Sequence, residues 1–203
     1  SNNKTMKRYK YILFFFFTFS LSLQVVAQTM RVVSFRLLAH DLTANLEGTS
    51  RLDQNGETAA LIRIVTTEKG FSFEGGLLGI VGSEQKEGEV WLYVPRLTSK
   101  LTIHHPRFGV LRDFIYPQTI ESGRTYEMLL DIGMGCFVTI NSTRKGADVI
   151  IDGQYIGKTP FYNYYLLYGP HTIKATLGKW EGTLAHTVSA NDTATAKQTV
   201  LTV

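Results

Sequence analysis

The chain has 203 residues, 44% of them hydrophobic, and a formal net charge of +4. This length is enough to bury one or two small hydrophobic cores. Four of the 21 Lys and Arg residues lie in the first 27 positions, which contain no Asp or Glu, so the remaining 17 basic residues balance 17 acidic ones. Nucleic-acid binding needs Lys and Arg gathered along one face, and the neutral remainder contains no such run. The composition therefore argues against a nucleic-acid partner.

The first 27 residues have the pattern of a secretory signal peptide. A basic head that ends at Lys10 is followed by an apolar stretch over residues 11–23 and by Val25-Val26-Ala27, which offers small residues before a cleavage position. The apolar stretch is too short for a stable membrane span. We expect residues 1–27 to be a cleaved signal peptide and the protein to be exported to the periplasm or the outer cell surface. An uncleaved anchor is the alternative.

Alternating apolar residues predict a series of β-strands from residue 30 to residue 132. Val33, Phe35 and Leu37 share one side of a first strand. The segment 58–66 is apolar on both sides apart from Arg63, which predicts a central strand covered on each face. Turn signals recur about every ten residues, as is typical of a sandwich or barrel. Further strands are expected over residues 90–94, 101–103, 108–115 and 125–132.

Two loops in this region carry partial signatures of ligand sites. The glycine-rich stretch from Gly75 to Gly82 lacks the Lys-Ser or Lys-Thr ending of a phosphate loop, so we interpret it as a bulged or edge strand. Asp53, Asn55 and Glu57 supply too few oxygens for calcium, which takes about six to eight. The polar stretch that contains them is therefore interpreted as a turn.

Patterns for catalysis and metal binding are weak. His104 and His105 are neighbours in an expected strand and so point to opposite faces, which does not favour a shared metal. The sequence contains no nucleophile elbow, zinc-protease helix or paired-carboxylate scaffold. Cys136 is the only cysteine, so it cannot form an internal disulfide, and we expect it to be a small buried hydrophobic residue. We expect no enzymatic activity, no metal and no cofactor.

A second β unit follows Gly133–Gly135, where glycines interrupt the alternation and provide a joint. Apolar runs at 137–140 and 149–151 flank a polar loop, and Asp152-Gly153 is a tight-hairpin signal. The sequence predicts an all-β protein of two small antiparallel β-sandwich domains after the signal peptide, an N-terminal domain over residues 28–134 and a second over residues 136–203. The last strands are expected over residues 171–177, 180–188 and 195–203.

The second unit contains an ordered pattern of turn, small and apolar residues, formed by Ser142, Gly146, Ala147, Val149, Ile151, Asp152, Gly153, Gly157, Thr159, Pro160, Leu166, Gly169 and His171. With this pattern the unit resembles the PEGA family of small β-sandwich modules from exported bacterial envelope proteins. Arg144 and Lys145 stand where the family has proline and glutamate, which makes this loop more basic and removes a residue that fixes φ. The resemblance implies a β-sandwich fold and an envelope location.

The preceding segment resembles the amino-terminal region before PEGA repeats in exported proteins of Gram-negative gut anaerobes. The similar stretches are V-V-S-F-R-L-L-A-H-D-L-T-A-N, D-Q-N-G-E-T-A-A-L-I-R-I and T-Y-E-M-L-L. Some longer relatives continue into a domain like the sulfatase-modifying enzymes, which we expect this chain to lack. The resemblance therefore implies an alternative function, an accessory module that presents or regulates a separate sulfatase-modifying-like enzyme domain.

The candidate binding residues all lie in the second unit. Tyr162, Tyr164 and Tyr165 belong to an aromatic stretch that either fills the core or forms an exposed patch able to stack on sugar rings. Arg144 and Lys145 are a local basic feature of an otherwise neutral chain. We expect these five residues to bind a cell-envelope glycan or protein partner. Edge strands are expected to permit strand addition or self-association.

The stretch Asp192-Thr193-Ala194 resembles an O-glycosylation signal used by some gut anaerobes, which makes Thr193 a candidate for modification. Together, the sequence features predict a non-catalytic exported binding or scaffolding protein of the cell envelope. Such a protein would recognise a glycan or another envelope protein through loops and strand edges.

Overall fold

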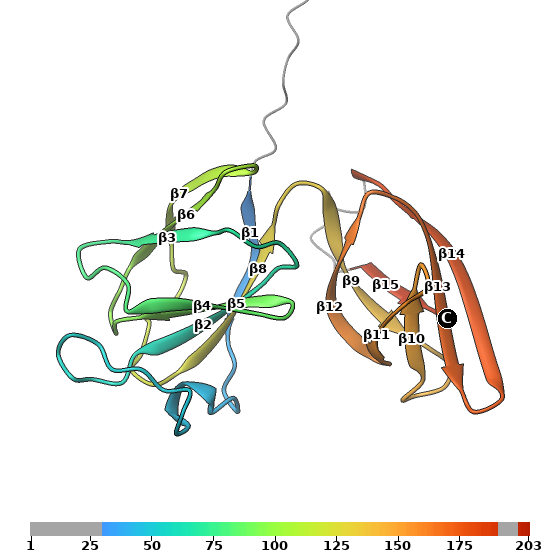
Figure 1. Ribbon diagram of the computed structural model, residues 1–203, viewed down its shortest axis with the longest axis horizontal. Coiled ribbons are helices and arrows are strands. Elements are labelled where there is room, and N and C mark those ends of the chain that lie inside the picture. Colours follow the sequence, from blue (N-terminus) through green and yellow to red (C-terminus); the bar gives the residue numbers. More distant parts are fainter. Residues whose placement is uncertain (1–29, 191–198) are drawn as a thin grey trace, which may run out of the picture.

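A computed structural model describes residues 30–190 and 199–203, so the expected signal peptide and Thr193 lie outside the described residues. Within the described ranges, strands dominate, and a short 3-10 turn, η1 (Thr43–Asn45), follows the first strand. None of this helical structure is long and apolar enough to cross a membrane. The strands form two units, one before residue 133 and one from residue 135, which lie side by side (Figure 1). The predicted all-β fold class is confirmed.

The first unit consists of two sheets with a hydrophobic core between them. Ile62 and Met128 of the larger sheet meet Leu101 and Ile103 of the smaller sheet in that core. The larger sheet has the order β1 (Arg31–Leu37), β8 (Thr125–Asp131), β2 (Ala60–Val65), β5 (Glu89–Val94), β4 (Gly82–Lys86). The smaller sheet has the order β3 (Ser72–Gly75), β6 (Lys100–His105), β7 (Gly109–Ile115).

The central position of β2 explains its apolar sequence. β2 pairs with β5 on one side and with β8 on the other. Ile62 and Ile64 belong to the core between the sheets, whereas Leu61 packs with Ala44 of η1 on the opposite face. Both faces are therefore covered at these residues, as the sequence predicts, whereas Arg63 on the outer face is only partly buried. The pairing of β2 with β8 is parallel, which departs from the expected purely antiparallel arrangement.

A β-bulge alters the predicted alternation of β1. Its register against β8 shifts between Val32 and Ser34, which inserts Val33 as an extra residue. Val33 is consequently 49% exposed. The residues of β1 that pack against the core are Val32, Phe35 and Leu37, so the prediction that Val33 shares one side with Phe35 and Leu37 is wrong.

Both loops with partial ligand signatures are turns. Residues 76–81 connect β3 to β4 and contain no strand, so the predicted bulged or edge strand is wrong for this stretch. Both strands that it joins do lie at the edges of their sheets. In the acidic loop, an Asp53 carboxylate oxygen accepts hydrogen bonds from the backbone N–H groups of Asn55 and Glu57 at 2.8 and 3.0 Å. The carboxylate thereby closes the turn.

The second unit also has two sheets around a core. Val138, Ile140 and Leu166 of the smaller sheet pack with Val149 and Ile173 of the larger one. The larger sheet has the order β11 (Gln154–Lys158), β10 (Asp148–Ile151), β13 (Gly169–Leu177), β14 (Trp180–Val188). The smaller sheet has the order β12 (Phe161–Leu167), β9 (Gly135–Asn141), β15 (Thr199–Thr202), in which β15 runs parallel to β9.

The hairpin between β10 and β11 follows the sequence prediction. Its two turn residues, Asp152 and Gly153, have φ angles of 49° and 84°, which is the left-handed pair that a tight primed turn requires. An Asp152 carboxylate oxygen also accepts the backbone N–H of Thr172 on β13 at 2.9 Å. The aspartate therefore both forms the turn and ties it to the neighbouring strand.

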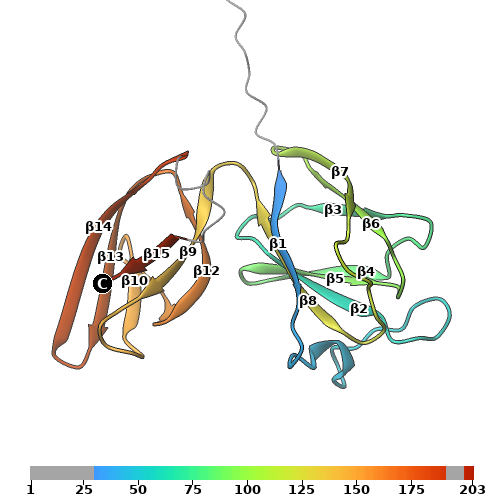
Figure 2. The ribbon, with the colours of Figure 1, turned by 180° about the vertical axis from the view of Figure 1, so that it is seen from behind.

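One short connection joins the two units. The chain leaves β8, passes Gly133 with a φ of 77°, and enters β9 (Figure 2). Phe137 and Tyr165 come from the second unit but belong to the hydrophobic cluster of the first. Cys136 is buried, as predicted, and packs in the core of the second unit. Packing at the joint is therefore continuous from one unit to the other.

Candidate functional site

An open cleft of about 1230 Å³ lies between the two units. Side chains of the five-stranded sheet form one wall, and side chains of β11 and β12 form the other. Charged residues prevail on the first wall and aromatic residues on the second. Clefts between domains are a common location of binding sites, so we consider this cleft the candidate site.

The strand register places the charged residues in one row across the sheet. Arg36 of β1 lies opposite Glu127 of β8, which lies beside Arg63 of β2, which in turn lies opposite Trp91 of β5. Paired residues on adjacent strands project from the same face. This face points away from the core of the first unit, since Arg36, Arg63 and Glu127 all line the cleft.

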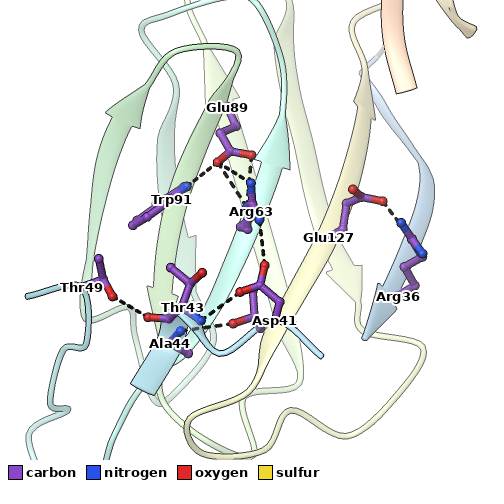
Figure 3. A network of polar contacts seen from close by, with 10 residues as sticks. Arg36, Asp41, Thr43, Ala44, Thr49, Arg63, Glu89, Trp91 and Glu127 are labelled. Carbon is purple, nitrogen blue, oxygen red and sulfur yellow. Dashed lines mark hydrogen bonds and ion pairs between the residues drawn. The ribbon is translucent and has the colours of Figure 1, made fainter. Parts of the chain in front are cut away.

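Arg63 is the centre of a polar network at this wall (Figure 3). Its guanidinium contacts Asp41 at 2.7 Å and Glu89 at 3.0 Å, and Glu89 also accepts the indole N–H of Trp91 at 2.6 Å. Burial opposes the charge of Arg63, but the hydrogen bonds from it to Glu89 and Asp41 outweigh this effect and raise its pKa. The network therefore holds a charged guanidinium in a fixed position at the cleft.

A second ion pair lies next to this network. The Nε of Arg36 donates to Glu127 at 2.9 Å, and the amide of Asn163, from the opposite wall, donates to the same carboxylate oxygen at 3.3 Å (Figure 3 shows the Arg36–Glu127 contact). Glu127 thus joins β1, β8 and β12. This contact spans the cleft and sets the separation of its walls at that point.

A bulge in β12 shapes the aromatic wall. Phe161 lies opposite Ile140 and Tyr164 opposite Val138, so β12 uses one more residue than β9 over the same distance. Asn163, inside the bulge, has a left-handed φ of 58°. In a regular strand Phe161 and Tyr164 would point to opposite faces, but here both pack against the core of the second unit.

The bulge leaves Tyr162 outside the core, with 64% of its surface exposed at the cleft. Tyr155 of β11, 57% exposed, lines the same wall. Tyr164 is half-buried and also reaches the cleft, and its burial raises the pKa of its phenol. The wall therefore presents two exposed phenol rings and the edge of a third.

Tyr165 has a different role from the one predicted for it. Its side chain is only 7% exposed, so it cannot belong to an exposed aromatic patch. Its position after the bulge turns it toward the first unit, where its hydroxyl donates to Asp131 at 2.7 Å. The same oxygen accepts the backbone N–H of Met134 at 3.0 Å. Tyr165 closes the end of the cleft at the joint.

Arg144 and Lys145 are exposed, but they do not line the cleft. Hydrogen bonds of two nearby hydroxyl groups hold the backbone of their loop in place. Thr159 donates its hydroxyl to the carbonyl of Arg144 at 3.2 Å, and Ser142 contacts the Thr159 hydroxyl at 2.9 Å. The structure therefore does not bring these two basic residues together with the tyrosines.

Sequence reasoning missed the residues of the charged wall and Tyr155. Arg36, Arg63, Glu89 and Glu127 are far apart in the sequence, and only the strand order brings them into one row. The one available signal was Arg63, a charged residue inside an otherwise apolar central strand. Within residues 30–190 and 199–203, no group of three or more His, Cys, Asp or Glu residues is arranged to hold a metal ion.

Comparison with known families supports the assignment of the second unit. Residues 136–200 match the family model of the PEGA domain. This range contains the aromatic wall of the cleft, whereas the charged wall lies outside it. No curated protein and no solved structure matches the chain.

Proposed function

We propose that this chain, whose residues 136–200 match the PEGA domain, is a non-catalytic binding or scaffolding protein of the cell envelope. The ligand is a component of the envelope, and it binds in the cleft between the two units. Export by the N-terminal 27 residues belongs to the same proposal, as does a location in the periplasm or on the outer surface. The PEGA match supports an envelope-associated module.

The observation that carries this proposal is the composition of the cleft. Exposed Tyr155 and Tyr162 face a wall of charged groups that are fixed by ion pairs. Aromatic rings with an apolar body and a polar tip, opposite a few oriented polar groups, are features of binding surfaces. All three predicted tyrosines line the cleft, Tyr162 and Tyr164 along its aromatic wall and Tyr165 at its closed end.

The ion pairs of the cleft favour binding. Glu89 is paired with Arg63, and Glu127 is paired with Arg36. Paired groups of this kind present carboxylate oxygens and guanidinium nitrogens in set positions, which suits them to hydrogen bonds with a ligand.

A protein ligand is the second candidate, and the position of two edge strands favours it. β4 and β11 both lie at sheet edges, and Lys86 of β4 and Tyr155 of β11 both line the cleft. An extended segment of a partner could add to either edge. The accessory-module function, in which the chain presents or regulates a separate sulfatase-modifying-like enzyme domain, would use the same edges.

Co-sedimentation with insoluble envelope material from a Gram-negative anaerobe tests the proposal. We expect the protein to sediment with this material and the Tyr162→Ala variant to remain largely in the supernatant. Lys145→Ala is the matched control, because Lys145 is exposed in the same unit but lies outside the cleft. Equal sedimentation of the wild type and Tyr162→Ala would refute the cleft as the binding site. Treatment of the material with protease or with periodate separates a protein ligand from a glycan ligand.

A further inference from the structure

We infer that the cleft binds a neutral polysaccharide chain, whose sugar rings stack on Tyr155 and Tyr162 and whose hydroxyl groups bond to the Arg36–Glu127 and Arg63–Glu89 pairs. This inference rests on the proposed function and specifies its ligand. It joins residues from both units, so neither unit alone contains the site.

The charges of the cleft point to a ligand without net charge. The lining carries both signs of charge, with Arg36, Arg63, Lys69 and Lys86 against Glu87, Glu89 and Glu127. Arg36 and Arg63 are each paired with a carboxylate, and Arg63 contacts a second one, Asp41. Lys86 is paired with Glu84. A polyanion would meet Glu89 and Glu127 at the same surface as the cations, so repulsion would cancel much of its attraction. A polycation would meet the arginines in the same way. A neutral polar ligand avoids both costs.

The ion pairs match the groups that a sugar presents. A hydroxyl both donates and accepts hydrogen bonds, and adjacent ring hydroxyls can bond to a guanidinium and to a carboxylate at the same time. Arg36 contacts Glu127 through Nε, and its side chain is 58% exposed, which leaves its terminal nitrogens accessible from the cleft. Because the pairs are already formed, the protein side chains need little reordering on binding.

The exposed tyrosines supply the apolar part of the contact. Tyr155 and Tyr162 are 57% and 64% exposed, which is a large fraction for residues on paired strands. One face of a hexose ring carries mainly C–H groups, and burial of such a face against an aromatic ring is favourable. The bulge at Asn163 is what turns Tyr162 out of the core, so the fold specifies this exposure.

The size of the cleft indicates a chain of sugars. Its volume of about 1230 Å³ exceeds the roughly 300–1,000 Å³ that is usual for small-molecule sites. The cleft is also open, so a long ligand can enter and leave at the sides. A polysaccharide segment of several units fits these features better than a single metabolite.

Binding of the full chain to a defined set of polysaccharides tests the inference. The probes are neutral glucan, mannan and galactan, with polygalacturonate and heparin as anionic comparisons. We expect at least one neutral polymer to bind, and its affinity to change little between about 50 mM and about 500 mM salt, because no counterions are released. Preferential binding of either polyanion, with strong salt dependence, would overturn the inference.

Variants of both walls complete the experiment. Tyr162→Ala and Arg36→Met should each weaken binding of the neutral polymer about fivefold or more. The first removes an aromatic ring on which a sugar stacks, and the second removes the guanidinium donors that bond to sugar hydroxyl groups. Tyr168→Ala is the control for Tyr162→Ala, since Tyr168 is also exposed in the second unit but does not line the cleft. Arg112→Met serves the same purpose for Arg36→Met, since Arg112 is exposed on β7 of the first unit and does not line the cleft. Undiminished binding in both cleft variants would overturn the inference.

The result also separates this inference from the proposed function. If sedimentation with envelope material depends on Tyr162 while no neutral polysaccharide binds, the cleft is a binding site for another ligand and only the inference is refuted. If sedimentation does not depend on Tyr162, both are refuted. Circular dichroism of each variant confirms the fold, which these exposed positions should leave intact.

Discussion

The Tyr165 hydroxyl donates a hydrogen bond of 2.7 Å to the Asp131 carboxylate, and this contact joins the last strand of the first unit to β12 of the second. Burial raises the pKa of the Tyr165 phenol far above its usual range, with a further contribution from Asp131, so the phenol remains a donor at any physiological pH. Asp131 also pairs with Arg31 at 2.9 Å. The joint beside the cleft is therefore fixed by polar contacts as well as by packing.

Removal of this hydroxyl should destabilise the protein. In Tyr165→Phe, the N–H of Met134 loses its acceptor and Asp131 loses a donor in a buried environment. We expect a cost of about 1–3 kcal/mol in the free energy of unfolding, measured by urea denaturation. Tyr168→Phe, at an exposed tyrosine three residues away, should cost little. Equal stability of the two variants would show that the Tyr165–Asp131 contact contributes nothing.

Two glycines of the PEGA pattern should differ in their sensitivity to alanine. A Cβ atom at Gly157 would lie 2.5 Å from a ring carbon of Phe161, which packs against the core, so Gly157→Ala forces that ring to move. A Cβ at Gly153 meets no atom within 4 Å, and only its left-handed φ of 84° opposes the substitution. We expect losses of about 1–3 kcal/mol for Gly157→Ala and about 1 kcal/mol for Gly153→Ala in chemical denaturation. The reverse order would contradict the close packing of the Phe161 ring against Gly157.

Asp41 should contribute to stability in a pH-dependent manner. Burial tends to raise the pKa of Asp41, but hydrogen bonds from Thr43 and Arg63 outweigh it and hold this pKa below its ordinary value. A carboxyl with a lowered pKa in the folded state stabilises that state above its unfolded pKa, and this stabilisation is lost as the pH falls through the folded pKa. Asp41→Asn should therefore be less stable than the wild type at neutral pH, and the difference should shrink as the pH falls below the ordinary pKa of an aspartate. Urea denaturation at a series of pH values measures this, and parallel curves would contradict it.

The thiol of Cys136 should be unreactive in the folded protein. It is buried at the start of β9 and packs in the core of the second unit. Because the reagent must reach the sulfur and Cys136 is buried, we expect an aromatic disulfide reagent to modify Cys136 slowly in buffer and rapidly in denaturant. Since the chain has one cysteine, the absorbance change reports this site alone. Rapid modification under native conditions would show that the second unit opens readily.

Local patterns predicted much of the fold. The Asp152-Gly153 turn and the doubly covered strand β2 were both evident in the sequence, because each depends on short-range patterns of turn residues or apolar residues. Cys136 was predicted to be buried from its apolar neighbours alone. Such features need no knowledge of which distant strands pair.

The cleft could not be predicted in the same way. Two bulges, at Val33 and at Asn163, shift the alternation of side chains between the two faces of a strand. This alternation is the only feature of the sequence that indicates to which face a side chain points. Tyr162 is exposed, whereas Tyr165 is buried by its contacts with Asp131 and Met134 at the joint, and the sequence offers no signal that separates the two. The charged wall depends on the parallel pairing of β2 with β8, a long-range contact with no local signal.

The most direct test of the central claim is an NMR titration of the isotopically labelled full chain with hexasaccharides of glucan, mannan and galactan. At least one of them should shift the amide signals of Arg63, Tyr155, Tyr162 and Asn163, which come from both walls of the cleft. The signals of Arg144 and Lys145 should remain in place. Shifts confined to the Arg144–Lys145 loop, or no shifts with any of the three sugars, would contradict the account.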